Sequence, residues 1–307
     1  MKSQISDKSI YEFIFEFYTF NKMSNTQILQ AKNLINNSDA IMIGAGAGLT
    51  ASGGYNYVNP QIFEANFPDF KKLGYKTIWD CVSTFWNVND DNELEYYGYW
   101  TNHIRKIRYE APVGQPYLYL KHIIDNCNKD YFIFTSNVDH QIQKSGFPED
   151  KVLATQGNYM YFQCSKPCSQ DVYDNYDYVM NITDNIERPS MKCRPCDVPH
   201  CPKCGRRLIP NLRSDSHFVE GPHMKNYHLL NEFINRHKND KVVILELGVG
   251  FNSPGLIRFP FDNLVYKNKN WNMIRINLTD PQTPVEIRDR AVVIQDDIGS
   301  VLRQINE

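Results

Sequence analysis

The segment GAGAGLTASGG, residues 44–54, decides how the whole sequence is interpreted, because it directly follows the short apolar run AIMI at residues 40–43. A buried strand that ends in a glycine-rich turn is the order found at the start of nucleotide-binding folds. Gly44, Gly46 and Gly48 have no side chain, so they let backbone N–H groups approach a pyrophosphate. An ordinary tight turn is the alternative interpretation, since a glycine triplet alone is a weak signal.

A parallel sheet is predicted by four further apolar runs of strand length. These runs are YFIFTS (131–136), KVVILELG (241–248), NMIRINL (272–278) and AVVIQ (291–295). Uninterrupted apolar runs are typical of strands that helices bury on both faces. Helical spacing is present at residues 1–38, where Ile10 and Phe17 share a face, and at 116–127, 224–237 and 298–305. This alternation predicts an α/β fold with a doubly wound, mostly parallel, Rossmann-like sheet.

Two of these runs end in segments that can contact a ligand. Asn137 and Asp139 lie just past the run at 131–136, at the edge where sheets of this class bind ligands. An amide that donates and accepts, beside a carboxylate that accepts, can recognise a carboxamide. Helix capping by either residue is the alternative. A second Gly-x-Gly, with Gly248 and Gly250, follows the run at 241–248, so two glycine turns could flank one ligand.

A metal site is predicted by the cysteines, because six of the eight fall between residues 164 and 204 in close pairs. Cys164 and Cys168, with Cys201 and Cys204, can form a tetrahedral thiolate site that holds a structural zinc ion. Cys193 and Cys196 form a third pair, which either is free or replaces Cys164 and Cys168. We expect residues 159–214 to be a small zinc-binding domain, inserted into a Rossmann-like domain made of residues 1–158 and 215–307.

The composition of the chain limits which partners and which cellular location we expect. The 307 residues are 42% hydrophobic and 22% charged, which is typical of a folded enzyme-sized protein. With 33 basic and 35 acidic side chains, the net charge of −2 does not favour binding to nucleic acid. No apolar run reaches the roughly 18 residues of a membrane helix. We therefore expect a cytoplasmic protein with neither nucleic acid nor membrane as a partner.

With these motifs in this order, the chain resembles the sirtuins from about residue 40 to residue 302. GAGLTASGGY at 46–55 is similar to the family's GAGxSxxSGI, TSNVDHQIQKSG to its TQNIDxLxxxAG, GVGFNSPG to its GTSxxVxP, and CPKCGRRLIP to its CPxCGGxLRP. The resemblance implies NAD as a co-substrate and a structural zinc ion. The NAD-binding residues that it implies are Gly44, Ala45, Gly46, Ala47, Gly48, Thr50, Tyr55, Asn137, Asp139, Gly248, Gly250, Asn252, Ser253, Asn277, Asp297 and Ile298.

Two departures from the sirtuin pattern concern activity. Gln156 stands where the family has a histidine general base, and glutamine cannot accept a proton at neutral pH. Loss of a general base typically costs about 10²–10⁴ in rate, so efficient deacylation is not favoured. Arg213 and Asp215 stand where the family has an apolar acyl-binding sequence, and a charged wall does not favour an acyl chain.

This combination resembles the class M sirtuins of microbial pathogens. That resemblance implies an NAD-dependent protein ADP-ribosyltransferase, with Asn137, Asp139 and Gln156 as catalytic residues and Arg213 and Asp215 on the substrate side. It also implies a lipoylated glycine-cleavage H-like carrier as acceptor and a macrodomain hydrolase as the opposing enzyme. A residual NAD-dependent deacylase, a plain NAD glycohydrolase and an NAD sensor without turnover are the alternatives.

Overall fold

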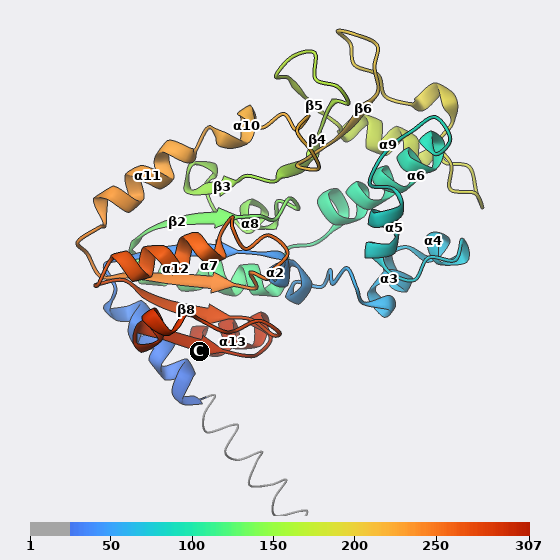
Figure 1. The fold of residues 1–307 in the computed structure, drawn as a ribbon. Helices are drawn as coiled ribbons and strands as arrows, with labels where there is room; N and C mark the ends of the chain where they lie inside the picture. The colour runs from blue at the N-terminus through green and yellow to red at the C-terminus, as the bar shows by residue number, and fades with distance from the viewer. Residues whose placement is uncertain (1–24) are drawn as a thin grey trace, which may run out of the picture.

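The computed structural model describes residues 25–307 of the chain, and Figure 1 shows their arrangement. The predicted helical face at Ile10 and Phe17 lies outside the described residues. Within the described part, residues 25–37 are helical, as predicted for the end of that segment. No helix of the described residues is long and apolar enough to cross a membrane.

The larger sheet has six parallel strands, in the order β3-β2-β1-β7-β8-β9. Their bounds are β1 (Ala40–Ala45), β2 (Asp130–Thr135), β3 (Val152–Ala154), β7 (Val242–Leu247), β8 (Asn272–Ile276) and β9 (Ala291–Ile294). Strands β1 and β7 are buried along their whole length, as continuous apolar runs predict. The doubly wound parallel sheet is confirmed. The strand order reverses between β1 and β7, which is where ligands bind in open α/β sheets.

Helices cover both faces of this sheet. On one face, the helix at 25–37 packs with α7 (Gln115–Cys127) and α13 (Ile298–Asn306), and Ile28, Leu120 and Val301 belong to one buried cluster. On the other face lie α11 (Tyr227–Arg236) and α12 (Arg258–Lys267), with Phe233 and Phe261 in a second cluster. The switch point of the sheet is therefore held between two packed layers.

A smaller antiparallel sheet has the order β5-β4-β6. Its strands are β4 (Gly157–Cys164), β5 (Val172–Asp174) and β6 (Leu208–Leu212). Helix α9 (Tyr176–Asp184) lies between β5 and β6 in the chain. Figure 1 shows this sheet near helices from a much earlier part of the chain. These are α3 (Pro60–Asn66), α4 (Pro68–Lys72), α5 (Ile78–Thr84), α6 (Glu93–Ile104) and the π-helix η1 (Arg105–Glu110).

One hydrophobic cluster joins these early helices to the smaller sheet. Phe63, Tyr99 and Ile107 from the helices pack in it with Phe162 and Leu208 from the sheet. The segment at 159–214 therefore builds its core together with residues 60–110, which helps a cysteine-rich module that is too small to bury much apolar surface alone.

Candidate functional site

Two adjoining cavities lie beside the carboxyl ends of the central strands, one of about 380 Å³ and one of about 570 Å³. We call them the first and the second cavity. The residues that line both are Ala47, Gly48, Ala51, Asn56, Ser136 and Asn252. Because these residues come from the turn after β1, the end of β2 and the segment after β7, the two cavities form one continuous cleft at the switch point.

The two glycine turns pack directly against each other at the floor of this cleft. Gly48 donates its N–H to the carbonyl of Gly248 at 3.0 Å, and a Cβ atom on Gly248 would stand 2.5 Å from the Cα atom of Gly48. Gly248 also has a φ of +63°, which favours glycine. Gly46 donates its N–H to Leu247 O at 3.0 Å. These amides therefore hold the turns together, and the missing side chains leave the cleft open.

The first cavity is lined mainly by the segments that follow β7, β8 and β9. The sequence-predicted residues on its wall are Gly46, Ala47, Gly48, Gly248, Gly250, Asn252, Ser253, Asn277, Asp297 and Ile298. Asn277 is fixed there, since its amide donates to Val249 O at 3.0 Å and its carbonyl oxygen accepts from the N–H groups of Thr279 and Asp280. Asp297 caps α13 by accepting from Ser300 N at 2.9 Å.

The second cavity contains Asn137, Asp139, Thr50 and Tyr55 on its wall. Asp139 is buried, and its carboxylate accepts from the Thr50 hydroxyl at 2.6 Å and from Gln141 N at 3.0 Å. Burial raises the pKa of Asp139, while the hydrogen bond from Thr50 acts in the opposite direction. The Asn137 amide donates to Gly46 O at 3.0 Å. A strand end and a glycine turn thus position an amide and a carboxylate side by side.

Four aromatic side chains also line this wall: Tyr55, Tyr57, Trp79 and Tyr159. Tyr57 lies 3.1 Å from the Tyr159 hydroxyl and 3.2 Å from His103 Nε2, and His103 Nδ1 lies 3.0 Å from the Tyr99 hydroxyl. Burial lowers the pKa of His103 to about 3, and burial raises the pKa values of Tyr57 and Tyr159. At neutral pH, Tyr57 and Tyr159 therefore stay protonated and His103 stays neutral, so none of them serves as a general base.

Several predicted site residues lie away from both cavities. Gly44 and Ala45 are buried within β1, and a Cβ atom on Gly44 would stand 2.5 Å from the Phe261 ring. The Gln156 amide donates to Thr155 Oγ1 at 3.2 Å. Neither cavity has Gln156 on its wall.

The two predicted substrate residues are engaged locally, and neither cavity has them on its wall. Arg213 pairs with Glu220 at 2.7 Å and stacks on Phe218, with its guanidinium carbon 4.5 Å from the ring centroid. Asp215 accepts from His217 N at 2.7 Å. Arg213 also donates its backbone N–H to Gln156 O at 3.0 Å, which ties β6 to the segment that carries Gln156.

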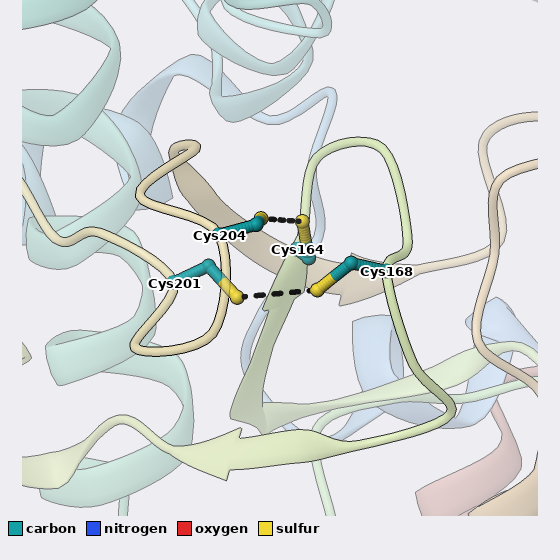
Figure 2. Close-up of side chains that lie close together, drawn as sticks. All are labelled: Cys164, Cys168, Cys201 and Cys204. Carbon is teal, nitrogen blue, oxygen red and sulfur yellow. Dashed lines mark hydrogen bonds between the residues drawn. The ribbon is translucent and has the colours of Figure 1, made fainter.

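The thiols of four cysteines gather in the smaller module, as Figure 2 shows. Cys164 Sγ lies 3.6 Å from Cys204 Sγ, and Cys168 Sγ lies 3.7 Å from Cys201 Sγ. A tetrahedral zinc site with Zn–S bonds of 2.3 Å requires sulfur atoms roughly 3.8 Å apart. The donor set and its spacing therefore fit a closed structural zinc site. Cys193 and Cys196 lie outside this cluster, so the structure favours the first of the two ligand sets that the sequence allowed.

Four residues of the cleft were not predicted from the sequence: Asn56, Tyr57, Trp79 and Tyr159. Asn56, Tyr57 and Trp79 follow the first glycine turn, in a region where no predicted strand ends and where no motif indicates a ligand site. Tyr159 alternates along β4 with residues that face the other way. Their role at the cleft follows only from the packing of the smaller module against the large sheet.

Two curated relatives are similar to this chain over most of its length. A protein ADP-ribosyltransferase of Staphylococcus aureus (strain Mu50) is 30% identical over 273 residues, which cover 88% of this chain and 84% of that protein. A probable bifunctional ADP-ribose hydrolase/ADP-ribosyltransferase of Fusarium oxysporum f. sp. cubense is 29% identical over 281 residues, which cover 89% of this chain and 46% of that protein. No protein-family model matches the sequence.

Solved structures of Sir2 enzymes have the same fold. One that describes the mechanism and regulation of Sir2 enzymes has a TM-score of 0.55 at 18% identity, covering 91% of this chain and 96% of that one. A complex of a Sir2 homologue with NAD has a TM-score of 0.52 at 16% identity, covering 90% and 91%. At these identities the similarity shows the sirtuin fold.

Proposed function

This chain belongs to the sirtuin-fold protein ADP-ribosyltransferases, and from that premise we propose that it transfers ADP-ribose from NAD to a protein acceptor, with release of nicotinamide. The observation that carries the proposal is the continuous cleft at the switch point of the sheet, with Asn137 and Asp139 at one end. Its two cavities differ in lining, as the two ends of a dinucleotide require.

The adenosine and pyrophosphate part of NAD belongs in the first cavity. The glycine turns keep its floor free of side chains, and Ser253 and Asn252 supply polar groups beside them. Asn277 is held by three hydrogen bonds at the end of β8, so a ligand there meets a fixed surface. A preformed cleft lowers the entropic cost of ordering a flexible dinucleotide.

The nicotinamide riboside part belongs in the second cavity, beside Asp139. Asp139 is the one charged side chain among the described residues on that wall. When the bond between the ribose C1′ atom and the nicotinamide nitrogen breaks, its electron pair goes to the ring nitrogen and positive charge develops on the ribose. A carboxylate held in a fixed position stabilises such charge strongly. The acceptor nucleophile then forms a bond to C1′, and its proton passes to solvent water.

No histidine lies on the described wall of the second cavity, and this favours transfer over deacylation. Gln156 cannot accept a proton, and burial keeps Tyr57 and Tyr159 protonated and His103 neutral. A reaction in which the acceptor is already a good nucleophile does not require a strong base, because orientation and charge stabilisation lower the barrier. Gln156 and Arg213 lie next to each other at the margin of the smaller module, where they can order the acceptor-binding segment.

For the acceptor we propose a lipoylated carrier protein, on the strength of the sequence resemblance to class M sirtuins. A hydrolase that removes ADP-ribose is proposed as the opposing enzyme, since the Fusarium relative is described as combining hydrolase and transferase functions in one chain. We propose a cytoplasmic location because none of the eight cysteines, all of them among the described residues, forms a disulfide, a state that reducing compartments maintain.

The experiment that tests the proposal measures nicotinamide release from NAD by the pure protein, with and without a lipoylated carrier. Release that rises with carrier concentration and is lost in Asn137→Ala supports transfer. Release that is independent of the carrier, with free ADP-ribose as the other product, identifies a glycohydrolase. Stoichiometric NAD binding without release identifies a sensor.

A further inference from the structure

A third cavity of about 480 Å³ lies outside the NAD cleft and contains the two unpartnered polar atoms of the described chain. Among buried side-chain nitrogen and oxygen atoms of residues 25–307, only Arg108 Nε and His140 Nδ1 have no hydrogen-bond partner. Both residues line this cavity. Buried polar atoms in native proteins nearly always have partners, so two orphans in one cavity point to a missing ligand.

Arg108 is the stronger of the two observations. Arg108 is 9% exposed within η1, and it forms no ion pair with any of the described residues. Its contacts are Met160 Sδ at 3.6 Å and the face of Tyr109 at 5.5 Å. A buried guanidinium without an anion is costly, because the desolvated charge is not compensated. An anion in the cavity would remove that cost.

The rest of the wall has the polarity of an anion site. Lys225 is exposed on it. His140 and His223 also line it as neutral imidazoles, because burial lowers the pKa of each to about 4. Glu149 is the one carboxylate on the wall; its side chain is largely exposed and lies 3.7 Å from His140 Nε2. Two further carboxylates, Asp139 and Asp174, attract Arg108 from a distance without pairing with it. The charged groups of the described wall are therefore two cations, Arg108 and Lys225, and one carboxylate, Glu149.

We propose that this third cavity, the Arg108 pocket, binds a small metabolite through a phosphate or carboxylate group. Arg108 Nε–H donates to an anionic oxygen, and His140 Nδ1 donates to a second oxygen or accepts from a phosphate hydroxyl, according to its tautomer. The volume leaves room for a compact organic part beside the anionic group.

The Arg108 pocket lies behind the NAD cleft. Asp139 lines the second cavity and the next residue, His140, lines the Arg108 pocket. On β4, Tyr159 faces the cleft, whereas Asn158 and Met160 face the pocket. The two sites thus share a backbone segment and a strand, but different side chains form their walls. Anion binding in the Arg108 pocket therefore does not depend on the proposed transferase reaction.

Calorimetric titration of the full chain with sodium phosphate, and separately with sodium malonate, at constant ionic strength tests this proposal. Binding of either anion at one site is expected, with affinity at least tenfold lower in Arg108→Met and several-fold lower in Lys225→Met, whose exposed position makes misfolding no concern. Arg288→Met, at an exposed arginine away from the pocket, should bind as the wild type does. The tighter of the two anions identifies the ligand class.

Three results would overturn the inference. One is the lack of binding by both anions, and another is equal affinity in the wild type and Arg108→Met. The third is phosphate binding that saturating ADP-ribose abolishes, because the anion would then occupy the NAD cleft. That third result would leave the transferase proposal intact, so the two proposals can fail separately.

Discussion

Thr50 donates a hydrogen bond of 2.6 Å from its hydroxyl to Asp139 Oδ2, and both residues are buried beside the second cavity. Thr50 comes from α2 (Ala47–Ser52), just after the first glycine turn, and Asp139 comes from the segment after β2. The bond therefore joins two segments that are 89 residues apart in sequence at the point where we place the reacting ribose. Its removal should change activity and pH dependence together.

Thr50→Val is expected to lower the rate of nicotinamide release by about ten- to a hundredfold, since a hydrogen bond to a charged group contributes about 1.5–3 kcal/mol. The pKa of Asp139 is already raised by burial, and the Thr50 hydroxyl lowers it. The proposed reaction requires the carboxylate form of Asp139, so activity should fall as pH decreases through this pKa. The acid limb of the pH–rate profile should move to higher pH in Thr50→Val and stay in place in Thr50→Ser. An unmoved limb in Thr50→Val would refute this role.

Removal of the metal should unfold the smaller module. Cys204→Ser is expected to lose zinc and to lower the melting temperature strongly, because a structural zinc site supplies much of the folding free energy of a small domain. Metal content per chain, measured by atomic emission, and thermal unfolding check this. Cys196→Ser is the matched control, since Cys196 is exposed and outside the cluster, and it should keep one zinc per chain. Zinc loss in Cys196→Ser instead would assign the metal to the other cysteine pair.

Gly248→Ala should lower the free energy of unfolding by at least about 2 kcal/mol and abolish NAD binding. The new side chain would clash with the backbone of the other glycine turn, and alanine is strained at the positive φ of this position. A Cβ atom there would stand 2.5 Å from the Cα atom of Gly48. Urea unfolding and titration with NAD measure the two effects. Gly255→Ala serves as control, since a Cβ atom on Gly255 meets nothing within 4 Å. Wild-type behaviour of Gly248→Ala would mean that the turns are not packed as described.

Acid should destabilise the protein through His103. Burial lowers its pKa from the ordinary 6.5 to about 3. Below pH 6.5, this imidazole therefore binds a proton in the unfolded chain but stays neutral in the folded chain. Stability is thus full above pH 6.5 and falls as pH decreases, by about 1.4 kcal/mol per pH unit from this group. Urea unfolding between pH 7 and pH 5 should show a smaller loss in His103→Gln than in the wild type. His228→Gln, at an exposed position, should leave the slope unchanged. Parallel slopes in all three proteins would contradict the assignment.

Much of the large sheet was predictable because its strands are buried on both faces and therefore read as apolar runs. The runs at 40–43, 131–136 and 291–295 correspond to β1, β2 and β9. Strand β3 (Val152–Ala154) was not predicted, since three residues are too few to show a pattern. The smaller sheet and the helices at 60–110 were also missed, because their shared core forms between segments about 100 residues apart.

The site was predictable where residues follow strand ends. Asn137, Asp139, Asn277 and the two glycine turns line the cleft, because carboxyl ends of parallel strands meet at one edge. Tyr57 and Tyr159 were not predictable, since their positions depend on how the smaller module packs. The orientation of the Gln156 side chain was likewise not predictable: the residue takes the position of the sirtuin histidine in the sequence, but its amide donates a hydrogen bond to Thr155.

The most direct test of the transferase account follows the ADP-ribose group itself. The pure protein is incubated with NAD labelled in its adenylate phosphate and with a carrier protein that bears or lacks lipoate, and the products are separated by denaturing gel. The account predicts a labelled carrier band that requires the active protein and disappears in Asn137→Ala. Nicotinamide release with no labelled protein, under conditions where NAD is consumed, would contradict it.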